Sequence, residues 1–569
     1  MAMKYFRVFL STLVAFNFLC AKGSNTPYGK LAKQTVPVTE NKSIVLVVRS
    51  FNNEAVCEKN MASILSQDYP NFRVIFIDDT STDATFDKVA AYVKEHDTQH
   101  RVTMIRNSER FGALANCYYA VHRCKDDEIV AIVDGDDWLK RSDALSILNA
   151  YYANPDVWMT YGNHECYPYR KGIAKLFDPK KLADNGLRKV PFVASHLRTF
   201  YAALFKQVKL KDLFHSGKFY PIKEDIAYTF PMMEMARGHI YFVPEVLYVY
   251  NTVNPLNDFR KDQEWWKKIE SEIQNLPSYQ PLEQHPFKIK RPIERAHVGM
   301  IVSSYNRPMQ LYAYLESLEK HMQNVHHIKV IYRASDDKYE AGYAVVKKRF
   351  PNVQYIRQLD PPHDFKKLTL DALQDSYKDV DFITFGVDDI IFKDTCDLDD
   401  CARLMDKTGA YGFFLRMGRH INVCYMLKKR QPPPRSELVE SGVYAWQFCY
   451  GVADWAYPNS LDMTVYRIDQ ILPTFQKMTY SNPNLLESHW AKRANKQLLG
   501  LCYEQSKIVN IPVNVVSTFK NRNLRLYSAE QLLDMFFEGK KIDINAYYQM
   551  ENSSPHIMKG PTFIALSDD

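Results

Sequence analysis

The chain has 569 residues, more than one ordinary domain holds, and length alone favours roughly two to four domains. Hydrophobic residues make up 46% and charged residues 24%, near the globular norm, and the counts of 20 Gly and 28 Pro exclude collagen-like and low-complexity chains. A net charge of +7 over this length is too small to indicate a nucleic-acid-binding protein. The ten cysteines include no CxxC pair and no Cys/His cluster with zinc-ligand spacing. They indicate buried thiols, with one or two disulfides as the alternative.

The N-terminal segment 1–23 has the features of a targeting sequence. Lys4 and Arg7 precede an apolar run from Val8 to Leu19, and small residues follow it. This pattern is typical of a signal peptide or a short signal anchor, although an apolar N-terminal strand or helix is an alternative. The run is too short for a standard membrane-spanning helix. We therefore expect a secretory, lumenal or membrane-tethered protein, with membrane association through the N-terminus, and a cytoplasmic location stays open.

Strand and helix patterns alternate from Ser43 onward. Short apolar, β-branched runs predict buried parallel strands, and the longer stretches between them predict helices. The predicted order is strand 44–48, helix 54–66, strand 73–77, helix 84–95, strand 102–105, helix 112–123 and strand 129–133. This alternation predicts a doubly wound α/β sheet.

The same order of patterns returns in the second half of the chain. Three pairs of segments correspond: "IVLVVRSFNNE" (44–54) with "VGMIVSSYNRP" (298–308), "FRVIFIDDTSTD" (72–83) with "IKVIYRASDDKY" (328–339), and "EIVAIVDGDDWL" (128–139) with "DFITFGVDDIIF" (381–392). Ser50 precedes Asp136 by 86 positions, and Ser304 precedes Asp388 by 84. Matching elements at nearly equal spacing predict two tandem copies of one domain.

The predicted domain boundaries follow from this repeat. We expect the first copy at 43–253 and the second at 295–500. Between them, 254–294 carries a charged helix and then a Pro-rich polar stretch, which is typical of a linker. Residues 501–569 are expected to form a C-terminal tail that packs on the second copy.

Acidic residues directly follow two strands of the first copy. Asp78 and Asp79 end one strand, and Asp134, Asp136 and Asp137 end another. Open α/β sheets bind ligands at the edge where the carboxyl ends of their strands meet. Carboxylates gathered there repel one another unless a cation or hydrogen-bond donors neutralise them, and a divalent ion that also binds diphosphate oxygens would do so. A single Asp at a strand end is more often a turn or helix-capping residue.

Five segments of the first copy occur in a specific order: "VVRSFNNE", "IDDTSTDAT", "NSERFGALANC", "VDGDDWL" and "KEDIAYTFPMMEMARG". Residues 43–250 resemble, over this whole length, a family 2 glycosyltransferase with the GT-A fold. The resemblance implies a nucleotide-diphosphate sugar donor, most simply a UDP-sugar, and Mn²⁺ or Mg²⁺ as cofactor. It also implies an acceptor hydroxyl on a glycan, a lipid-linked glycan or a protein.

The resemblance assigns binding roles to individual positions. Asp79, with Asp78 beside it, matches the acid that binds the nucleotide base. Asp134 and Asp136 match the acids that contact the sugar nucleotide and the metal, and Asp137 is a further candidate ligand. The segment that packs along the nucleotide and sugar is matched by Asn107, Arg110, Gly112 and Asn116.

Glu224 and Asp225 match the acidic pair of the family, in which Asp225 would be the catalytic base. A base in this place contributes about 10²–10⁴ to the rate, and a single displacement inverts the anomeric configuration. Acids also suit the N-terminus of a helix, and the two interpretations are compatible because the pair opens a predicted helix. His196 and Arg198 are candidates for the acceptor side, with His196 favoured as a structural residue.

The second copy departs from this pattern. It has Gly386-Val387-Asp388-Asp389 where the first copy has Asp-Gly-Asp-Asp, so the first acid is missing, and Asp388 and Asp389 are its candidate metal ligands. At the nucleotide-base position the acids come later, as Asp336 and Asp337, and they follow Arg333. Arg333 is therefore a candidate for binding the nucleotide.

The second copy also lacks a matching acidic pair, and Glu487 lies about where the base is expected. His556 in the tail is a candidate metal ligand, although a lone His is more often a surface or core residue. Arg416 and Arg419 are candidates for binding phosphates, although a basic loop is usually only solvated.

These observations predict two tandem GT-A modules. The second is either a second active transferase or a module that binds the acceptor glycan without catalysis. Sugar nucleotidyltransferases share this fold, but "RSFNNEAV" lacks the Gly-rich loop that holds their triphosphate. A non-enzymatic glycan-binding protein is the remaining alternative.

Overall fold

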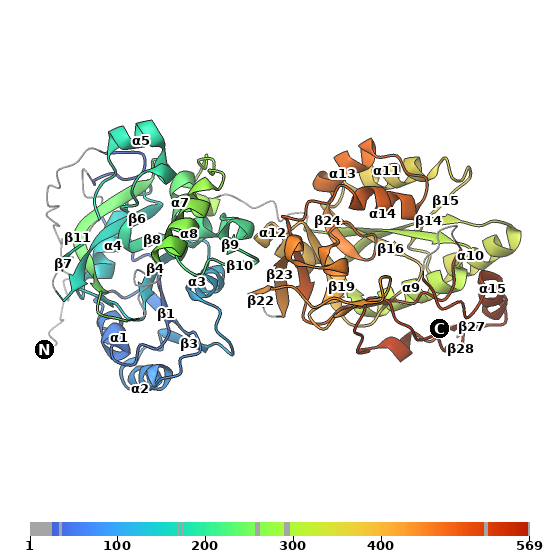
Figure 1. Ribbon diagram of the computed structural model, residues 1–569, viewed down its shortest axis with the longest axis horizontal. Coiled ribbons are helices and arrows are strands. Elements are labelled where there is room, and N and C mark those ends of the chain that lie inside the picture. Colours follow the sequence, from blue (N-terminus) through green and yellow to red (C-terminus); the bar gives the residue numbers. More distant parts are fainter. Residues whose placement is uncertain are drawn as a thin grey trace, which may run out of the picture. The chain divides into compact units, whose positions relative to one another are not determined.

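The computed structural model describes residues 25–32, 37–168, 170–172, 174–255, 262–288, 296–440, 442–516 and 522–566. The chain divides into two compact units, the first made of 1–208 and 220–289 and the second of 209–219 and 290–569 (Figure 1). The predicted targeting segment 1–23 lies outside the described residues. Among the described helices, none combines the length and apolar character needed to cross a membrane.

A nine-stranded mixed sheet forms the centre of the first unit. Its strand order is β3-β2-β1-β4-β8-β6-β11-β5, with β7 paired to β6. The strands are β1 (Ile44–Ser50), β2 (Phe72–Asp78), β3 (Val102–Arg106), β4 (Ile129–Asp134), β5 (Trp138–Leu139), β6 (Met159–Tyr167), β7 (Arg170–Lys171), β8 (Ser195–Tyr201) and β11 (Ile240–Asn251). β1 pairs in parallel with β2 and β4, whereas β8 runs antiparallel to β4 and β6. The predicted α/β class is confirmed.

Helices cover both faces of this sheet. Helices α1 (Cys57–Leu65), α2 (Thr85–His96) and α4 (Ala144–Tyr152) pack with Ile44, Leu46 and Val48 of β1 in one apolar core. Helices α3 (Ala113–His122), α6 (Ala202–Lys206) and α7 (Glu224–Met235) pack together on the other face. Because both faces are covered, every residue of β1 is buried, which explains its continuous apolar run.

The predicted linker segment carries a helix that belongs to the first unit. Helix α8 (Gln263–Asn275) buries Ile269 and Ile273. The guanidinium of Arg188 donates to the backbone oxygen of Ile273 at 2.9 Å and to both carboxylate oxygens of Glu234 at 2.7 Å. All three groups are buried, so this pair fastens α8 and α7 to one another.

The second unit has its own nine-stranded sheet, in the order β15-β14-β12-β16-β24-β19-β25-β23-β22. Its strands are β12 (Val298–Tyr305), β14 (Val325–Arg333), β15 (Gln354–Arg357), β16 (Phe382–Val387), β19 (Gly412–Gly418), β22 (Glu437–Glu440), β23 (Val443–Gln447), β24 (Thr464–Arg467) and β25 (Leu499–Tyr503). In the order of the sheet, the seven strands β15-β14-β12-β16-β24-β19-β25 correspond to β3-β2-β1-β4-β8-β6-β11 of the first unit. The pairing directions also agree, since β12 is parallel to β14 and β16, and β24 is antiparallel to β16 and β19. This shared topology supports the predicted repeat.

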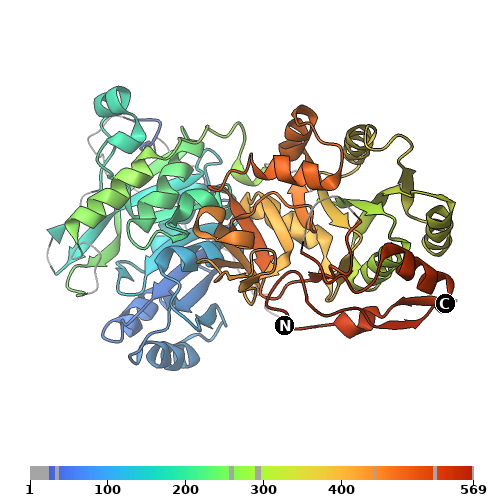
Figure 2. The same cartoon turned by 45° about the vertical axis from the view of Figure 1, so that its right-hand side comes forward.

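The helices of the second unit repeat the arrangement of the first. Helices α11 (Phe365–Ser376), α13 (Ile468–Lys477) and α14 (Pro483–Ala491) share an apolar core on one face of the sheet. Helices α9 (Pro308–His321), α10 (Asp337–Arg349) and α15 (Ala529–Phe537) pack together on the other face, as Figures 1 and 2 show. Helix α12 (Leu398–Thr408) precedes β19.

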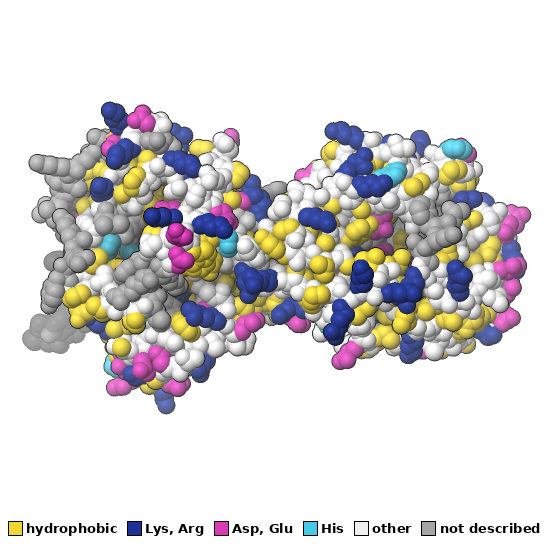
Figure 3. Space-filling view, viewed as in Figure 1, with side chains coloured by type: hydrophobic (Ala, Val, Ile, Leu, Met, Phe, Trp, Pro, Cys, Tyr) yellow, Lys and Arg dark blue, Asp and Glu magenta, His cyan; other side chains and the backbone are white. Residues whose placement is uncertain are grey.

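Residues beyond 500 are built into the second unit. Strand β26 (Ile508–Asn510) pairs antiparallel with β17 (Ile390–Phe392), which directly follows the acids of β16. Helix α15 packs on α9 and α10. On the face seen in Figure 3, Lys and Arg side chains are spread over both units, in keeping with the small net charge.

Candidate active sites

The carboxylate of Asp79, directly after β2, organises the loop that follows β3. It accepts hydrogen bonds from the backbone N–H groups of Phe111 (2.9 Å) and Gly112 (2.8 Å) and from the side-chain amide of Asn107 (2.8 Å). Asn107 also donates to the side-chain oxygen of Asn116 at 2.8 Å. Gly112 has a φ of 92°, a conformation that L side chains rarely adopt. Four of the predicted nucleotide-binding residues therefore form one network.

Asp78 and Arg110 differ in their exposure. Asp78 is fully buried and accepts a hydrogen bond from the backbone N–H of Ser81 at 3.1 Å, so it braces the turn. The exposed guanidinium of Arg110 lies 3.5 Å above the ring of Phe51, and its Nε is 4.0 Å from the Asp79 carboxylate. Arg110 is thus the member of this group that can reach a ligand at the surface.

A buried arginine neutralises two of the predicted acids. Arg49 of β1 lies opposite Asp134 of β4 in the parallel ladder, and the two side chains form a close ion pair. The same guanidinium is 3.6 Å from the carboxylate of Glu224. Although burial opposes it, the charge of Asp134 raises the pKa of Arg49 well above its ordinary value. Removing one partner of such a buried pair usually destabilises a protein by about 3–5 kcal/mol.

The neighbours Asp136 and Asp137 have different environments. Both oxygens of the buried Asp137 accept hydrogen bonds at 2.7 Å, from the hydroxyl of Tyr248 and from the backbone N–H of Asn251. Asp136 accepts one from the amide of Asn254 at 2.6 Å, and burial, assisted by Asp134, raises its pKa to about 6. Asp137 is therefore the least suited of the three acids to bind a cation, and its bonds instead fasten β11 to the turn after β4.

The two acids of the predicted catalytic pair, Glu224 and Asp225, have different partners and different exposure. Glu224 turns inward to Arg49, whereas the side chain of Asp225, at the start of α7, is 32% exposed. The buried guanidinium of Arg198, from β8, donates to the carboxylate of Asp225 at 3.3 Å and to the backbone oxygen of Ala194 at 3.2 Å. Asp225 is thus a positioned carboxylate at the surface of the unit.

His196 has a structural environment. Its ring is stacked on Tyr248 at a centroid distance of 4.7 Å and on Tyr250 at 5.7 Å. Burial lowers the pKa of His196 well below its ordinary value, which keeps the ring neutral.

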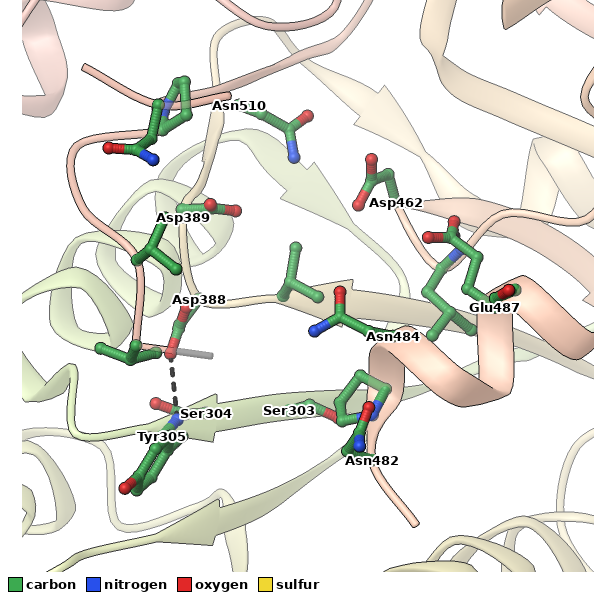
Figure 4. A pocket seen from close by; sticks show the side chains of 18 of the residues that line it. Ser303, Ser304, Tyr305, Asp388, Asp389, Asp462, Asn482, Asn484, Glu487 and Asn510 are labelled. Carbon is green, nitrogen blue, oxygen red and sulfur yellow. Dashed lines mark hydrogen bonds between the residues drawn. The ribbon is translucent and has the colours of Figure 1, made fainter. Parts of the chain in front are cut away.

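The second unit contains a pocket of about 1080 Å³ at the carboxyl end of β16. Its lining includes five of the residues predicted for the second copy as nucleotide-binding, metal-binding or catalytic: Arg333, Asp388, Asp389, Glu487 and His556. Figure 4 shows Asp388 and Asp389 on one side of this pocket and Asp462 and Glu487 on the other. Residues from segments between β12 and the C-terminal tail therefore line one pocket.

An arginine whose side chain is only 11% exposed also holds the acids of this second pocket. Arg307, at the start of α9, lies 2.9 Å from the Asp388 carboxylate and 3.6 Å from that of Asp389. Asp388 also accepts a hydrogen bond from the backbone N–H of Tyr305 at 3.3 Å (Figure 4). Burial raises the pKa of Asp389 to about 7, although the charge of Arg307 opposes this shift.

Glu487 lies in the second turn of α14, whereas Asp225 lies in the first turn of α7. It accepts a hydrogen bond from the backbone N–H of Leu461 at 3.0 Å. Burial, with the charge of Asp462, raises the pKa of Glu487 to about 7. A carboxyl group with a pKa near neutrality is suited to accept and release a proton.

His556 and Arg416 line the pocket of the second unit, whereas Arg419 does not. The ring of His556 is stacked on Tyr425 at 5.5 Å, and burial lowers the pKa of His556. The buried Arg416 lines the pocket and lies 3.4 Å from the carboxylate of Asp454. Arg419 is outside the lining, and its guanidinium is 3.5 Å from Glu504.

The strand register decides between two alignments of the copies that differ by one residue, namely 128–139 with 381–392 and Asp134–Asp137 with Gly386–Asp389. Arg49 pairs with Asp134 across β1 and β4, and the equivalent pair across β12 and β16 is Ser303 with Val387. Asp389, not Asp388, therefore occupies the position of Asp136. The first acid is absent from the second copy in either alignment.

Neither predicted metal site is a preassembled cluster of three ligands. Within the described ranges, only His297, His326 and Asp399 place three His, Cys, Asp or Glu donor atoms within 4.8 Å of one another. This group lies in the second unit, outside the lining of its pocket.

The sequence analysis did not identify Arg49 and Arg307, the arginines that form ion pairs with the acids. It named Arg198 but did not predict its ion pair with Asp225. Arg49 carried a usable signal, because a charged residue within an apolar strand requires a buried counter-charge. Tyr248 and Asn251 carried none, since their contacts with Asp137 depend on how β11 lies in the sheet.

Comparison with known proteins agrees with this geometry. The family described as Glycosyl transferase family 2 matches residues 45–214. These residues form a family 2 glycosyltransferase domain. The match includes the acids after β2 and β4, ends before Asp225, and does not extend to residues 290–569 of the second unit.

Curated relatives match part of this chain. The bifunctional glycosyltransferase pgtA of Dictyostelium discoideum is 24% identical over 191 residues, which are 31% of this chain and 24% of that protein. The UDP-Glc:alpha-D-GlcNAc-diphosphoundecaprenol beta-1,3-glucosyltransferase WfgD of Escherichia coli is 24% identical over 147 residues, 26% of this chain and 55% of that one. The GalNAc(5)-diNAcBac-PP-undecaprenol beta-1,3-glucosyltransferase of Campylobacter jejuni is 29% identical over 178 residues, 31% and 55% of the two chains. This chain thus spans between a quarter and about half of these relatives.

Solved structures align with less than half of the chain. Staphylococcus aureus TarS 1–349 in complex with UDP-GlcNAc has 15% identity and a TM-score of 0.32, covering 41% of this chain and 66% of that one. The mannosyltransferase PcManGT of Pyrobaculum calidifontis, in complex with GDP-Man and Mn²⁺, has 20% identity and a TM-score of 0.30, covering 41% and 63%.

Proposed function

We propose that the first unit transfers a sugar from a nucleotide-diphosphate sugar to an acceptor hydroxyl with inversion of the anomeric carbon. The observation that carries this proposal is the pairing of acids with fixed partners in the unit whose residues 45–214 match family 2. Asp134 is held by Arg49, and Asp225 is held by Arg198 from the neighbouring strand β8. A positioned carboxylate at the surface is what deprotonation of an acceptor hydroxyl requires.

Asp134 and Asp136 would hold Mn²⁺ or Mg²⁺ in this site. The chemistry fits, because Asp134 contributes to the raised pKa of Asp136, so a divalent cation would relieve a repulsion between the two carboxylates. Both ions prefer such oxygen ligands. When bound, the ion would supply positive charge that stabilises the diphosphate leaving group.

The residues of the chain perform the remaining steps of the proposed reaction. The loop organised by Asp79 and Asn107 would bind the nucleotide, with Arg110 at its exposed edge. Asp225 would accept the proton of the acceptor hydroxyl as that oxygen attacks the anomeric carbon. Arg198 would keep the carboxylate oriented throughout.

A UDP-sugar is the proposed donor and a glycan or lipid-linked glycan the proposed acceptor. The named activities of the relatives support this choice, because the Escherichia coli relative is a UDP-Glc-dependent transferase that acts on a diphosphoundecaprenol-linked sugar. A protein acceptor remains an alternative, and so does membrane association through the N-terminus.

A donor screen tests this proposal. We expect the purified full chain to release UDP from one UDP-sugar in the presence of Mn²⁺, with little release from GDP-mannose and none after EDTA is added. The measurement is nucleotide release with and without a glycan acceptor. Absence of metal-dependent UDP binding, measured by isothermal titration with UDP and Mn²⁺, would instead favour a non-enzymatic glycan-binding protein.

For the second unit we propose a second transferase site. The supporting observation is that a sheet of the same topology carries, at the same edge, a pocket lined by Asp388, Asp389 and Glu487. Glu487 would act as the base, and Arg333 would contact the donor. A pocket that binds acceptor glycan without catalysis is the alternative. The Dictyostelium relative is named as bifunctional, which is consistent with two activities on one chain.

The pKa of Glu487 predicts a pH dependence for this second transfer. Only the carboxylate form can accept a proton, and its pKa is raised to about 7. The rate of the second transfer should therefore rise as the pH increases through about 7 and level off above it. The measurement is transfer rate from pH 5 to 9, with Glu487→Gln as the control that should remain slow throughout. A rate that falls over the same range would remove Glu487 from the role of base.

A further inference from the structure

Three side chains from distant parts of the second unit meet away from its pocket. His297 lies one residue before β12, His326 lies on β14, and Asp399 lies in the first turn of α12. Nδ1 of His297 is 3.3 Å from Oδ2 of Asp399, and Nε2 of His326 is 3.1 Å from Oδ1. The two imidazole rings have centroids 3.6 Å apart, and their planes are tilted by 35°.

These separations match the edges of a metal coordination shell. Two ligand atoms that each lie about 2.05 Å from Zn²⁺ at the tetrahedral angle are about 3.3 Å from one another. An ordinary N–H···O hydrogen bond is shorter, about 2.9–3.0 Å. Of the four nitrogen–oxygen distances between the imidazoles and Asp399, three are 3.3 or 3.4 Å and one is 3.1 Å.

The donor groups are available to an ion from solvent. The side chains of His297, His326 and Asp399 are 41%, 32% and 31% exposed. In the described part of the chain, the Asp399 carboxylate contacts only these two imidazoles. Three protein ligands with one open face leave room for water as the fourth ligand of a tetrahedral ion.

We propose that His297, His326 and Asp399 form a binding site for a transition-metal ion, with Zn²⁺ as the best fit. Two imidazole nitrogens and one carboxylate oxygen favour Zn²⁺ over the hard ions Mg²⁺ and Mn²⁺. The site is separate from the oxygen-ligand site proposed for catalysis, and it does not depend on that function.

Such an ion would connect three elements of the second unit. Strands β14 and β12 are neighbours, second and third from the β15 edge of the sheet, and α12 leads into β19, which lies three strands beyond β12. An ion that binds only the folded arrangement of these residues stabilises the unit by mass action. The proposed role is therefore structural, at the point where the chain enters the second unit.

The experiment measures metal binding directly in the full-length chain. After treatment with EDTA and dialysis, wild type should take up Zn²⁺, and its thermal unfolding midpoint should rise with Zn²⁺ but not with Mg²⁺. Co²⁺ should give the visible absorption of a tetrahedral complex. His326→Ala and the nearly isosteric Asp399→Asn should each lose the Co²⁺ spectrum and the Zn²⁺-dependent shift.

A matched control comes from an ordinary His–Asp pair in the same unit. His363 lies 3.2 Å from Asp360, both are highly exposed, and no second imidazole is part of the pair. His363→Ala should keep the full Zn²⁺ response. The proposal is overturned if His326→Ala and Asp399→Asn, folded by circular dichroism, retain the Co²⁺ spectrum. It is also overturned if wild type gives no such spectrum, because the three side chains are then only a hydrogen-bonded cluster.

Discussion

Replacing Asp225 by Asn should lower transfer by the first unit by about two to four orders of magnitude while donor binding survives. The amide has the shape of the carboxylate and can still accept the hydrogen bond from Arg198, but it cannot take up the proton of the acceptor. The effect should fall on kcat and leave the dissociation constant for UDP unchanged. Steady-state kinetics with the donor identified by the screen, together with UDP titration, measure both quantities.

The matched control is Asp126→Asn in the same unit. Asp126 is an exposed acid whose ion pair with Lys206 spans 2.7 Å, so its replacement removes a carboxylate from the surface without touching the site. Its transfer rate should equal that of wild type. An unchanged rate in Asp225→Asn, or loss of UDP binding in that variant, would contradict the assignment of Asp225 as the base.

Much of the framework of both sites was predictable, because it depends on local patterns. Apolar runs followed by acids predicted β2 and β4 with Asp79 and Asp134 at their carboxyl ends, and the structure places them there. The alternation of strands and helices predicted the α/β class. The two sheets share their strand order, as equal spacing of matching segments led us to expect.

The environments of the individual acids were not predictable, since they depend on contacts between distant segments. Asp136 and Asp137 are neighbours in sequence, yet Tyr248 and Asn251 from β11 engage only Asp137. Arg198 on β8 reaches Asp225 on α7, a contact between two different elements that no local pattern reveals.

The second site was harder to predict for the same reason. Its acids lie at the end of β16, its base candidate Glu487 lies on α14, and His556 comes from the tail. Pairing of β26 with β17 places the tail beside these acids, and packing of α14 on the sheet core places Glu487 at the same pocket. The group of His297, His326 and Asp399 likewise has no spacing that a sequence motif would recognise.

Inactivating one unit at a time should separate two transfer activities. Asp136→Ala should abolish the first transfer, because it removes a proposed metal ligand at the carboxyl end of β4. Glu487→Gln should abolish the second, and its amide oxygen can still accept the hydrogen bond from Leu461. Glu487→Gln is preferable to removing Asp388 and Asp389, because removal of both acids would leave the largely buried Arg307 without its counter-charges.

The product of each variant decides between the two roles of the second unit. Sites in separate units should respond independently to substitution. If both units are transferases, Asp136→Ala and Glu487→Gln each omit a different sugar, and a mixture of the two variants rebuilds the full product when the intermediate is released. If the second unit only binds acceptor, Glu487→Gln raises the KM for acceptor or changes nothing, and mass spectrometry finds one type of sugar in the wild-type product. That second result, obtained with every donor the enzyme accepts, would exclude a second transferase site, since a base at Glu487 has no purpose without a donor of its own.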